Sequence, residues 1–169
     1  TKIEPEDDSQ WIFLPAIKRT KRISSSNRTG KFVSSEFSYE DFGSEEVEGN
    51  EHIWLADMPC PTDASLTCAQ VESRPKNARS GYSKRVSYTD LDEYRVHKIE
   101  FYNRRGDLEK VLIFEDYSQY LGQYWRSHKM IMENIQTGKS TKLNWGEYSF
   151  RNGLTEQDFT PQALERSSR

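Results

Sequence analysis

The sequence predicts a mostly β fold of the α+β class, built around one antiparallel sheet. Its 169 residues fit a single domain, and 4 Trp, 9 Tyr and 8 Phe supply much of the apolar area that a core needs. Short runs of aromatic and β-branched residues alternate with turn residues, which is typical of hairpin-linked strands. We therefore expect one domain over residues 1–169, with successive strands forming a meander.

Two strand candidates precede the most regular part of the chain. Residues 10–23 begin with Trp-Ile-Phe-Leu and continue as a basic stretch. Residues 51–58 contain a central Ile-Trp-Leu run. Both runs combine aromatic and β-branched residues, which favours extended backbone. The connecting residues 24–50 are polar and rich in Ser and Glu, so we expect mainly loop structure there.

The meander itself is expected over residues 82–150. Polar turns divide this region into short runs, and Gly106 lies in a predicted hairpin loop over residues 103–107, where it can adopt a positive φ without penalty. The alternation of apolar and polar residues then predicts five strands, at 82–88, 94–102, 108–117, 124–135 and 140–150.

Helices are expected to be few and short. One helical turn is predicted at residues 38–42. A second is predicted within residues 156–169, where Thr160 suits the N-cap position and Pro161 the first helical position.

Composition excludes several classes of function. The formal net charge is −3, so no excess of Lys and Arg is available to bind nucleic acid in general. No apolar run approaches the length of a membrane span, and we expect contact with membranes to be peripheral only. The sequence begins at Thr1 without a signal peptide, so the N-terminus does not reveal the compartment.

The two cysteines leave two alternatives open. Cys60 and Cys68 are separated by the loop sequence Pro-Thr-Asp-Ala-Ser-Leu-Thr. A local disulfide in an oxidising compartment and a pair of free thiols both fit this spacing.

Motifs for metal binding or catalysis are weak. His52, His97 and His128 have no His or Cys neighbour at metal-ligand spacing, and we expect each to be a solvated or half-buried strand residue. No nucleophile motif occurs, and no pair of the abundant carboxylates stands out as an acid and base. We therefore expect no metal, no cofactor and no enzymatic activity.

One sequence resembles the end of a phosphate-binding loop. Gly138-Lys139-Ser140-Thr141 has the right ending, but Glu133 stands where that motif requires its first glycine. Strands are predicted on both sides, whereas a phosphate loop leads into a helix. A hairpin turn is the better interpretation.

The densest basic run has two interpretations. Residues 18–22 read Lys-Arg-Thr-Lys-Arg and follow directly on the first apolar run. Such residues at a sheet edge discourage pairing with another chain, which is the interpretation we favour. The alternative is contact with anionic lipid headgroups or with an acidic partner.

Several sequence motifs occur in the same order as in one known family. Residues 11–23 (WIFLPAIKRTKRI) are similar to its strand with the pattern W-x-Y-L-P-x-x-x-R-x-R-R-I, and residues 36–42 (EFSYEDF) to its D-F-S-Y-E-D-L segment. Residues 98–110, 132–141 and 158–164 match later phrases of the same family. On these motifs the chain resembles the outer-membrane lipoprotein-sorting family, the relatives of LolA-type carriers.

The resemblance implies a fold and a function. The fold would be a curved antiparallel sheet that forms an unclosed half-barrel around an apolar interior, lidded by short helices. The function would be that of a periplasmic carrier for lipoprotein acyl chains or lipids, with an inner-membrane transporter or an outer-membrane acceptor as further partners. The family usually has an N-terminal helix and opening strands that this sequence does not include.

The same resemblance implies a cavity, although aromatic and methionine residues on strands usually form a core, which the residues alone favour. One alternative is therefore an envelope protein-interaction module with a filled core, and another is an enzyme with two converging carboxylates. On the carrier hypothesis, one face of each predicted strand lines the cavity. Because successive side chains of a strand point to opposite faces, alternate residues are assigned to that face. The residues chosen are Trp11, Phe13, Ile53, Leu55, Ile99, Phe101, Val111, Ile113, Met130, Met132 and Trp145.

Overall fold

The structure is a computed structural model that describes residues 9–43 and 46–167. The chain forms two compact units, one from residues 29–146 and the other from residues 1–28 together with 147–169. Each unit is described by itself. The sequence-based expectation of one domain over residues 1–169 stays a prediction.

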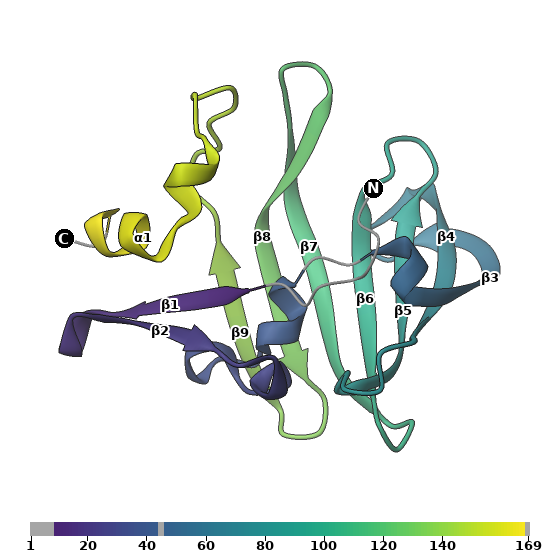
Figure 1. The fold of residues 1–169 in the computed structure, drawn as a ribbon. Coiled ribbons are helices and arrows are strands. Elements are labelled where there is room, and N and C mark those ends of the chain that lie inside the picture. Colours follow the sequence, from purple (N-terminus) through teal and green to yellow (C-terminus); the bar gives the residue numbers. More distant parts are fainter. Residues whose placement is uncertain (1–8, 44–45, 168–169) are drawn as a thin grey trace. The chain divides into compact units, whose positions relative to one another are not determined.

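The larger unit contains one seven-stranded antiparallel sheet, in which each strand pairs with the next along the chain (Figure 1). This is the meander predicted from the sequence. The strands are β3 (Asn50–Cys60), β4 (Asp63–Pro75), β5 (Tyr82–Asp90), β6 (Val96–Asn103), β7 (Leu108–Tyr120), β8 (Tyr124–Asn134) and β9 (Lys139–Asn144). Within the described residues β3 and β9 do not pair with each other, so the sheet is open.

Two tight hairpins depend on glycine. Gly106, between β6 and β7, has a φ of 88°, and Gly138, between β8 and β9, has a φ of 68°. Other residues avoid this left-handed region because their Cβ atoms clash with the backbone. Gly138 is thus in a β-hairpin, as expected, and strands rather than a helix follow it.

The strand boundaries differ from the prediction in two places. Residues 61–67 were expected to form a loop, but β4 begins at Asp63 and pairs with β3 as far as the disulfide region. Strand β9 ends at Asn144 instead of continuing to residue 150. In β4 the small and polar residues from Asp63 to Ser65 are exposed, so pairing through the backbone leaves no apolar alternation to detect.

The smaller unit contains a hairpin where one continuous strand candidate was expected. Strand β1 (Gln10–Leu14) pairs antiparallel with β2 (Arg19–Ile23). Pro15 begins the turn because proline cannot donate a ladder hydrogen bond and pre-sets the φ of a turn.

Helix α1 (Pro161–Ser167) contacts both strands of this hairpin and follows the 3-10 helix η6 (Glu156–Phe159). The side chain of Thr160 accepts a 3.2 Å hydrogen bond from the backbone N–H of Ala163. The N-cap predicted from the sequence is thereby confirmed.

The remaining helices are single 3-10 turns. The turn predicted at residues 38–42 is present as η4, with a capping box formed by Ser38 and Asp41. Turns η2, η3 and η5 lie in the polar stretch before β3, whereas η1 is the turn of the β1–β2 hairpin. Their bounds are η1 (Pro15–Ile17), η2 (Ser25–Asn27), η3 (Phe32–Ser34), η4 (Tyr39–Phe42) and η5 (Val47–Gly49).

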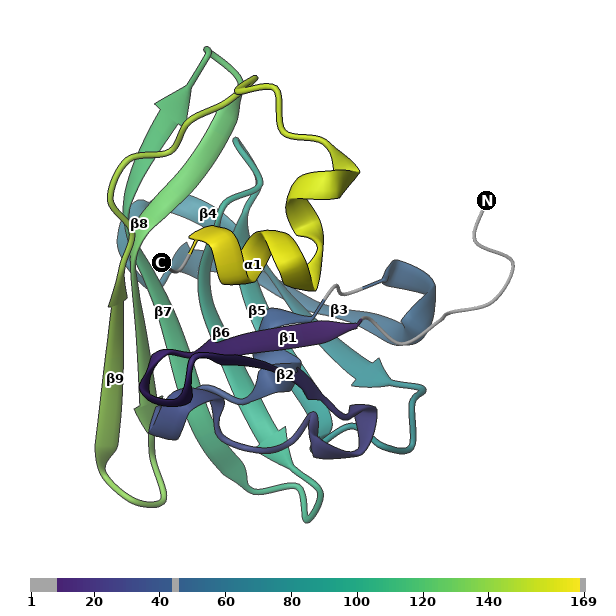
Figure 2. The same ribbon diagram turned by 60° about the vertical axis from the view of Figure 1, so that its left-hand side comes forward.

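The sheet curves, and residues 29–43 pack on its concave face (Figure 2). Their buried anchor is Phe37, with 2% of its surface exposed, and it contacts residues from β5 to β8. A second, smaller cluster lies on the convex face, around the disulfide at the β3–β4 hairpin. The curved, open, mostly β architecture agrees with the predicted fold class.

Candidate functional site

The register of β6 to β9 determines which side chains form the concave face. Ile99, Leu112 and Met132 lie directly opposite one another on neighbouring strands. Phe114 and Met130 form the next row, which continues to Leu143 on β9. Directly opposed residues project to the same side of a sheet, so these rows form one apolar surface.

One end of this surface is filled. Phe37 rests on Phe101, Leu112 and Met132, and Met132 has no exposed surface. The ring of Phe37 stacks on Phe42 at 5.3 Å between centroids, which closes the cluster from above. This end is core.

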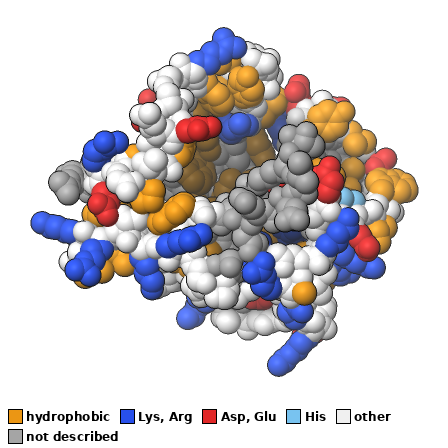
Figure 3. Space-filling model, viewed as in Figure 1, with side chains coloured by type: hydrophobic (Ala, Val, Ile, Leu, Met, Phe, Trp, Pro, Cys, Tyr) orange, Lys and Arg blue, Asp and Glu red, His pale blue; other side chains and the backbone are white. Residues whose placement is uncertain are grey.

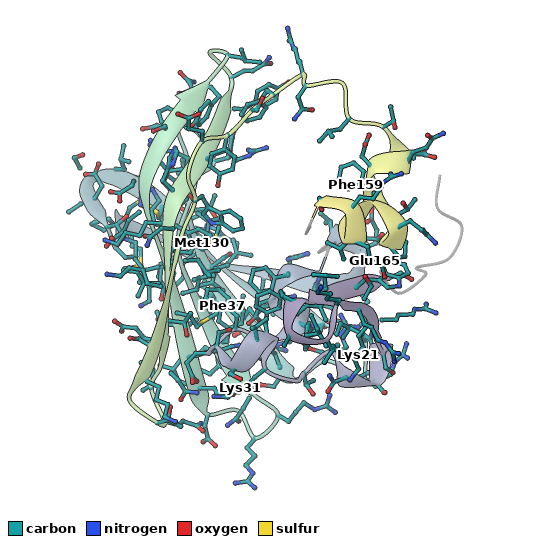
Figure 4. The ribbon with its side chains drawn as sticks, turned by 90° about the vertical axis from the view of Figure 1, so that its left-hand side faces the viewer. Lys21, Lys31, Phe37, Met130, Phe159 and Glu165 are labelled. Carbon is teal, nitrogen blue, oxygen red and sulfur yellow. A yellow bond between two sulfur atoms is a disulfide. The ribbon has the colours of Figure 1, made fainter. Side chains whose placement is uncertain are left out.

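The other end is only partly buried, and we call it the methionine strip. Its residues are Ile99, Phe114, Met130 and Leu143, which pack against the edge of the Phe37 cluster. In Figure 4, Met130 lies on the same side of the sheet as Phe37. Figure 3, which has the same view as Figure 1, shows apolar side chains around a hollow above the centre of the picture. A flexible methionine beside a phenylalanine suits contact with apolar groups of varied shape.

Four of the residues predicted for a cavity lie on this face, and two do not. Ile99, Phe101, Met130 and Met132 share the concave face. Val111 lies opposite Glu100, and Ile113 opposite Lys98, both on the convex face. The face assigned to β7 was therefore wrong, because Leu112 and Phe114 occupy the concave side instead.

The face assigned to β3 was wrong as well. Ile53 pairs with Glu72 on the convex side, whereas Trp54 pairs with Val71 on the concave side. Leu55 falls at a register shift, where it has no directly opposed residue. Such an irregularity re-aims the following side chains and is invisible in the sequence. All three apolar residues of this run are exposed, with Trp54 at 63%.

The remaining three candidates lie elsewhere. Trp145 follows the end of β9, and its backbone N–H donates to the carbonyl oxygen of His128. Trp11 and Phe13 lie in the smaller unit, on β1. Trp11 is 37% exposed, and the guanidinium of Arg22 lies 5.8 Å from its ring centroid. A role of any of these residues in binding stays a prediction.

A buried polar network, which sequence reasoning missed, holds residues 29–43 on the sheet. The Lys110 ammonium lies 2.7 Å from a carboxylate oxygen of Asp41, and both side chains are almost completely buried. Asp41 also accepts hydrogen bonds from the Tyr82 hydroxyl, at 2.6 Å, and from the backbone N–H of Ser38. Burial, together with the negative charge of Asp41, raises the pKa of Tyr82. A signal existed, since Lys110 is a charged residue directly before four apolar residues of the predicted strand.

The neighbouring carboxylates are anchors of the same kind. Glu36 accepts hydrogen bonds from Lys31 at 2.7 Å and from Asn134 at 2.9 Å. The hydrogen bond from Lys31 lowers the pKa of the Glu36 carboxyl against the opposing effect of burial. Glu40 accepts a 2.9 Å hydrogen bond from the backbone N–H of Gly81. Both carboxylates are hydrogen-bonded within the protein. The bonds from Asn134 and Gly81 attach residues 29–43 to the unit that contains the sheet.

A second buried group lies at the β3–β4 hairpin. Of the two alternatives for the cysteines, the structure has the disulfide, with a Cα–Cα distance of 4.9 Å between Cys60 and Cys68. The expectation that His97 is solvated or half-buried was wrong, since it is 5% exposed and close to both sulfur atoms. Its two ring nitrogens hydrogen-bond Thr62 and Asp90. With the sulfurs bonded to each other and both nitrogens engaged, this group is structural in its oxidised form.

Asp90 is the centre of that group. It has no exposed surface and accepts hydrogen bonds from the backbone N–H groups of Glu93 and Arg95, as well as from the Arg95 guanidinium at 2.8 Å. Burial alone would raise the pKa of this carboxyl, but these hydrogen bonds and that of His97 outweigh it and lower the pKa to about 2. Asp90 therefore ties the end of β5 to the start of β6.

Comparison with known proteins defines the class. A family model described as "Uncharacterized protein" matches residues 1–166. A solved structure from Vibrio parahaemolyticus, described as an outer membrane lipoprotein-sorting protein domain, is 46% identical over 94% of this chain, with a TM-score of 0.87. A DUF1329 family protein from Desulfovibrio piger is 25% identical over 95% of the chain, with a TM-score of 0.86. A LolA superfamily protein from Nitrosomonas europaea, 21% identical over 92% of the chain and covered to 68% of its own length, shares the fold with a TM-score of 0.69.

The chain belongs to the family that this model describes, and it shares its fold with the lipoprotein-sorting domain and with the LolA superfamily protein. The resemblance found in the sequence motifs is thereby confirmed. The chain spans 66% of the length of the first two solved structures. A search of curated proteins found no match. Among the described residues, no helix is long and apolar enough to cross a membrane.

Proposed function

We propose that the chain is a periplasmic binding protein of the bacterial envelope that carries a lipid or the acyl chain of a lipoprotein. The methionine strip is the observation that carries this proposal, because it is an apolar surface on the concave side of an open sheet that the core leaves partly uncovered. The lipoprotein-sorting description of the Vibrio relative supports it. Short helices would then lid an apolar interior, as in the fold predicted from the motifs.

Binding to such a surface requires no chemical step. Each CH₂ group removed from water contributes about 0.8 kcal/mol, so one acyl chain gives useful and reversible affinity. Release then needs only a competing apolar site in an acceptor, an inner-membrane transporter or the outer membrane. We accordingly propose a carrier and not an enzyme, with neither metal nor cofactor.

The register offers a sharp test of the strip. Met130 and Ile131 are neighbours on β8, but Met130 faces the concave side and Ile131 the convex side, opposite Ile113. We expect Met130→Asp to weaken binding of a fluorescent fatty acid by about tenfold to a hundredfold, the value of one buried apolar contact. Ile131→Asp should leave the affinity within about twofold, since it places the same charge on the other face.

Thermal melts of both variants separate a loss of binding from a loss of folding. If both variants fold and bind the fatty acid as tightly as the unchanged protein, the strip is not the binding surface. Equal weakening by both variants would also contradict the assignment, because it would reflect general damage to β8.

A second function, that of an envelope interaction module with a filled core, is favoured by one observation. Phe37 and the Asp41–Lys110 pair occupy the concave face beside β5 to β8. If no fatty acid binds to the unchanged protein, this face is core, and a protein partner becomes the better hypothesis.

A further inference from the structure

The turn of the β1–β2 hairpin exposes apolar and basic side chains side by side. Pro15, Ala16, Ile17 and Lys18 connect the two strands, and all four are exposed. Ile17 has 60% of its surface exposed. Together with the exposed Pro15 and Ala16, Ile17 forms an apolar hairpin tip that lies directly beside basic residues, a combination suited to a membrane interface.

Positive charge surrounds this turn. Lys18, Arg19, Lys21 and Arg22 are all exposed, and the sequence contains no Asp or Glu from Ser9 to Ser35. In the part of the chain that the structure describes, these four side chains have no carboxylate partner. Figure 3 shows Lys and Arg side chains on the left, where Figure 1 places the hairpin, and Figure 4 labels Lys21 on β2. Exposed Lys and Arg side chains of this kind can contact an external anion.

We propose that this hairpin docks on the surface of an anionic phospholipid bilayer. Ile17 and its apolar neighbours enter the headgroup region, while Lys18, Arg19 and Lys21 contact phosphate groups around it. The combination favours a bilayer over nucleic acid or an acidic protein surface, because phosphates or carboxylates alone would leave Ile17 without an apolar partner. Docking needs no cargo, so this inference goes beyond the carrier function.

The test measures co-sedimentation of the full chain with vesicles of phosphatidylcholine, alone or mixed with phosphatidylglycerol. We expect binding only to the mixed vesicles, weakened by salt. Each Lys or Arg near an anionic surface strengthens binding about fivefold, so Lys18→Gln/Arg19→Gln/Lys21→Gln should weaken it roughly a hundredfold. Ile17→Ser should weaken it about fivefold or more without changing the charge.

A matched control removes the same charge elsewhere. Arg105, Lys139 and Lys142 are exposed residues of the larger unit, and their joint change to Gln lowers the net charge equally. We expect this triple variant to lose less than about tenfold, since it leaves Ile17 and the charges of the hairpin unchanged. Equal losses in both triple variants would overturn the proposal, as would absence of binding to the mixed vesicles.

A further outcome identifies the competing partner. If the unchanged protein and Ile17→Ser bind a polyanion such as heparin equally well but neither binds vesicles, the hairpin recognises anionic polymers and the proposal fails. Vesicle docking and fatty-acid uptake are separate readouts. A chain that docks without taking up fatty acid therefore contradicts the carrier function alone.

Discussion

At the scale of single residues, Asp90 links protonation to folding. Its pKa of about 2 in the folded chain lies below the usual value near 3.9 of an unfolded chain. A lowered pKa means that the ionised form stabilises the fold above about pH 4. This stabilisation is lost as the pH falls towards 2, because the Asp90 carboxylate is then protonated and its hydrogen bonds from Glu93, Arg95 and His97 are weakened.

The corresponding prediction compares the unchanged protein with Asp90→Asn. We expect the variant to be less stable at pH 6, and the difference in unfolding free energy to shrink by about 2 kcal/mol on going to pH 2. Urea unfolding followed by tryptophan fluorescence at both pH values measures this change. A difference that does not vary with pH would show that the Asp90 carboxyl has an ordinary pKa.

The strand face on which a residue lies could not always be predicted from the sequence. Residues 110–114 of strand β7 read Lys-Val-Leu-Ile-Phe, with apolar residues on both faces, so alternation does not say which set faces inward. Val111 was chosen for the concave face, but Leu112 lies there, beside Met132. Only the pairing with neighbouring strands distinguishes the two, and that pairing is a property of the whole sheet.

At the scale of elements, the contact between residues 29–43 and the sheet includes one buried ion pair, between Asp41 and Lys110. Removing one member of such a pair leaves the other charge buried without compensation. We therefore expect Lys110→Met to lower the free energy of unfolding by about 3–5 kcal/mol. The double variant Lys110→Met/Asp41→Asn should recover part of this loss, since no charge is then left unpaired.

An exposed ion pair provides the control for this prediction. Lys129 lies 2.6 Å from Glu115, but both side chains are in contact with solvent. Lys129→Met should destabilise the protein much less than Lys110→Met in the same urea titration, because solvent screens an exposed pair. If Lys110→Met costs no more than Lys129→Met, the buried pair does not hold the segment in place.

Strands and helices were predictable where turn residues and the spacing of apolar residues indicate the same boundaries. Strands β5 to β8 follow from polar turns and from runs of aromatic and β-branched residues. Helix α1 follows from Thr160 and Pro161. In contrast, β4 is recruited by backbone pairing to β3 and β5 and lacks an apolar signal at its start. The hairpin of β1 and β2 was missed because the proline between them was not taken as a turn.

At the scale of the whole molecule, motif order was more informative than any single motif. The phrases of the lipoprotein-sorting family are distributed from residue 11 to residue 164, and the family model matches residues 1–166. The candidate binding surface, however, takes one face from each of four consecutive strands, β6 to β9. The face that each strand contributes depends on register, which is why family membership was predictable and the lining of the site was not.

The central claim, that the chain carries a lipid or acyl chain, is tested most directly by native mass spectrometry. The protein is purified from a bacterial periplasm, and bound material is then extracted and identified. The account predicts a bound lipid or acylated peptide in near-stoichiometric amount. A mass that corresponds to the protein alone, together with failure to take up added fatty acids, would contradict it.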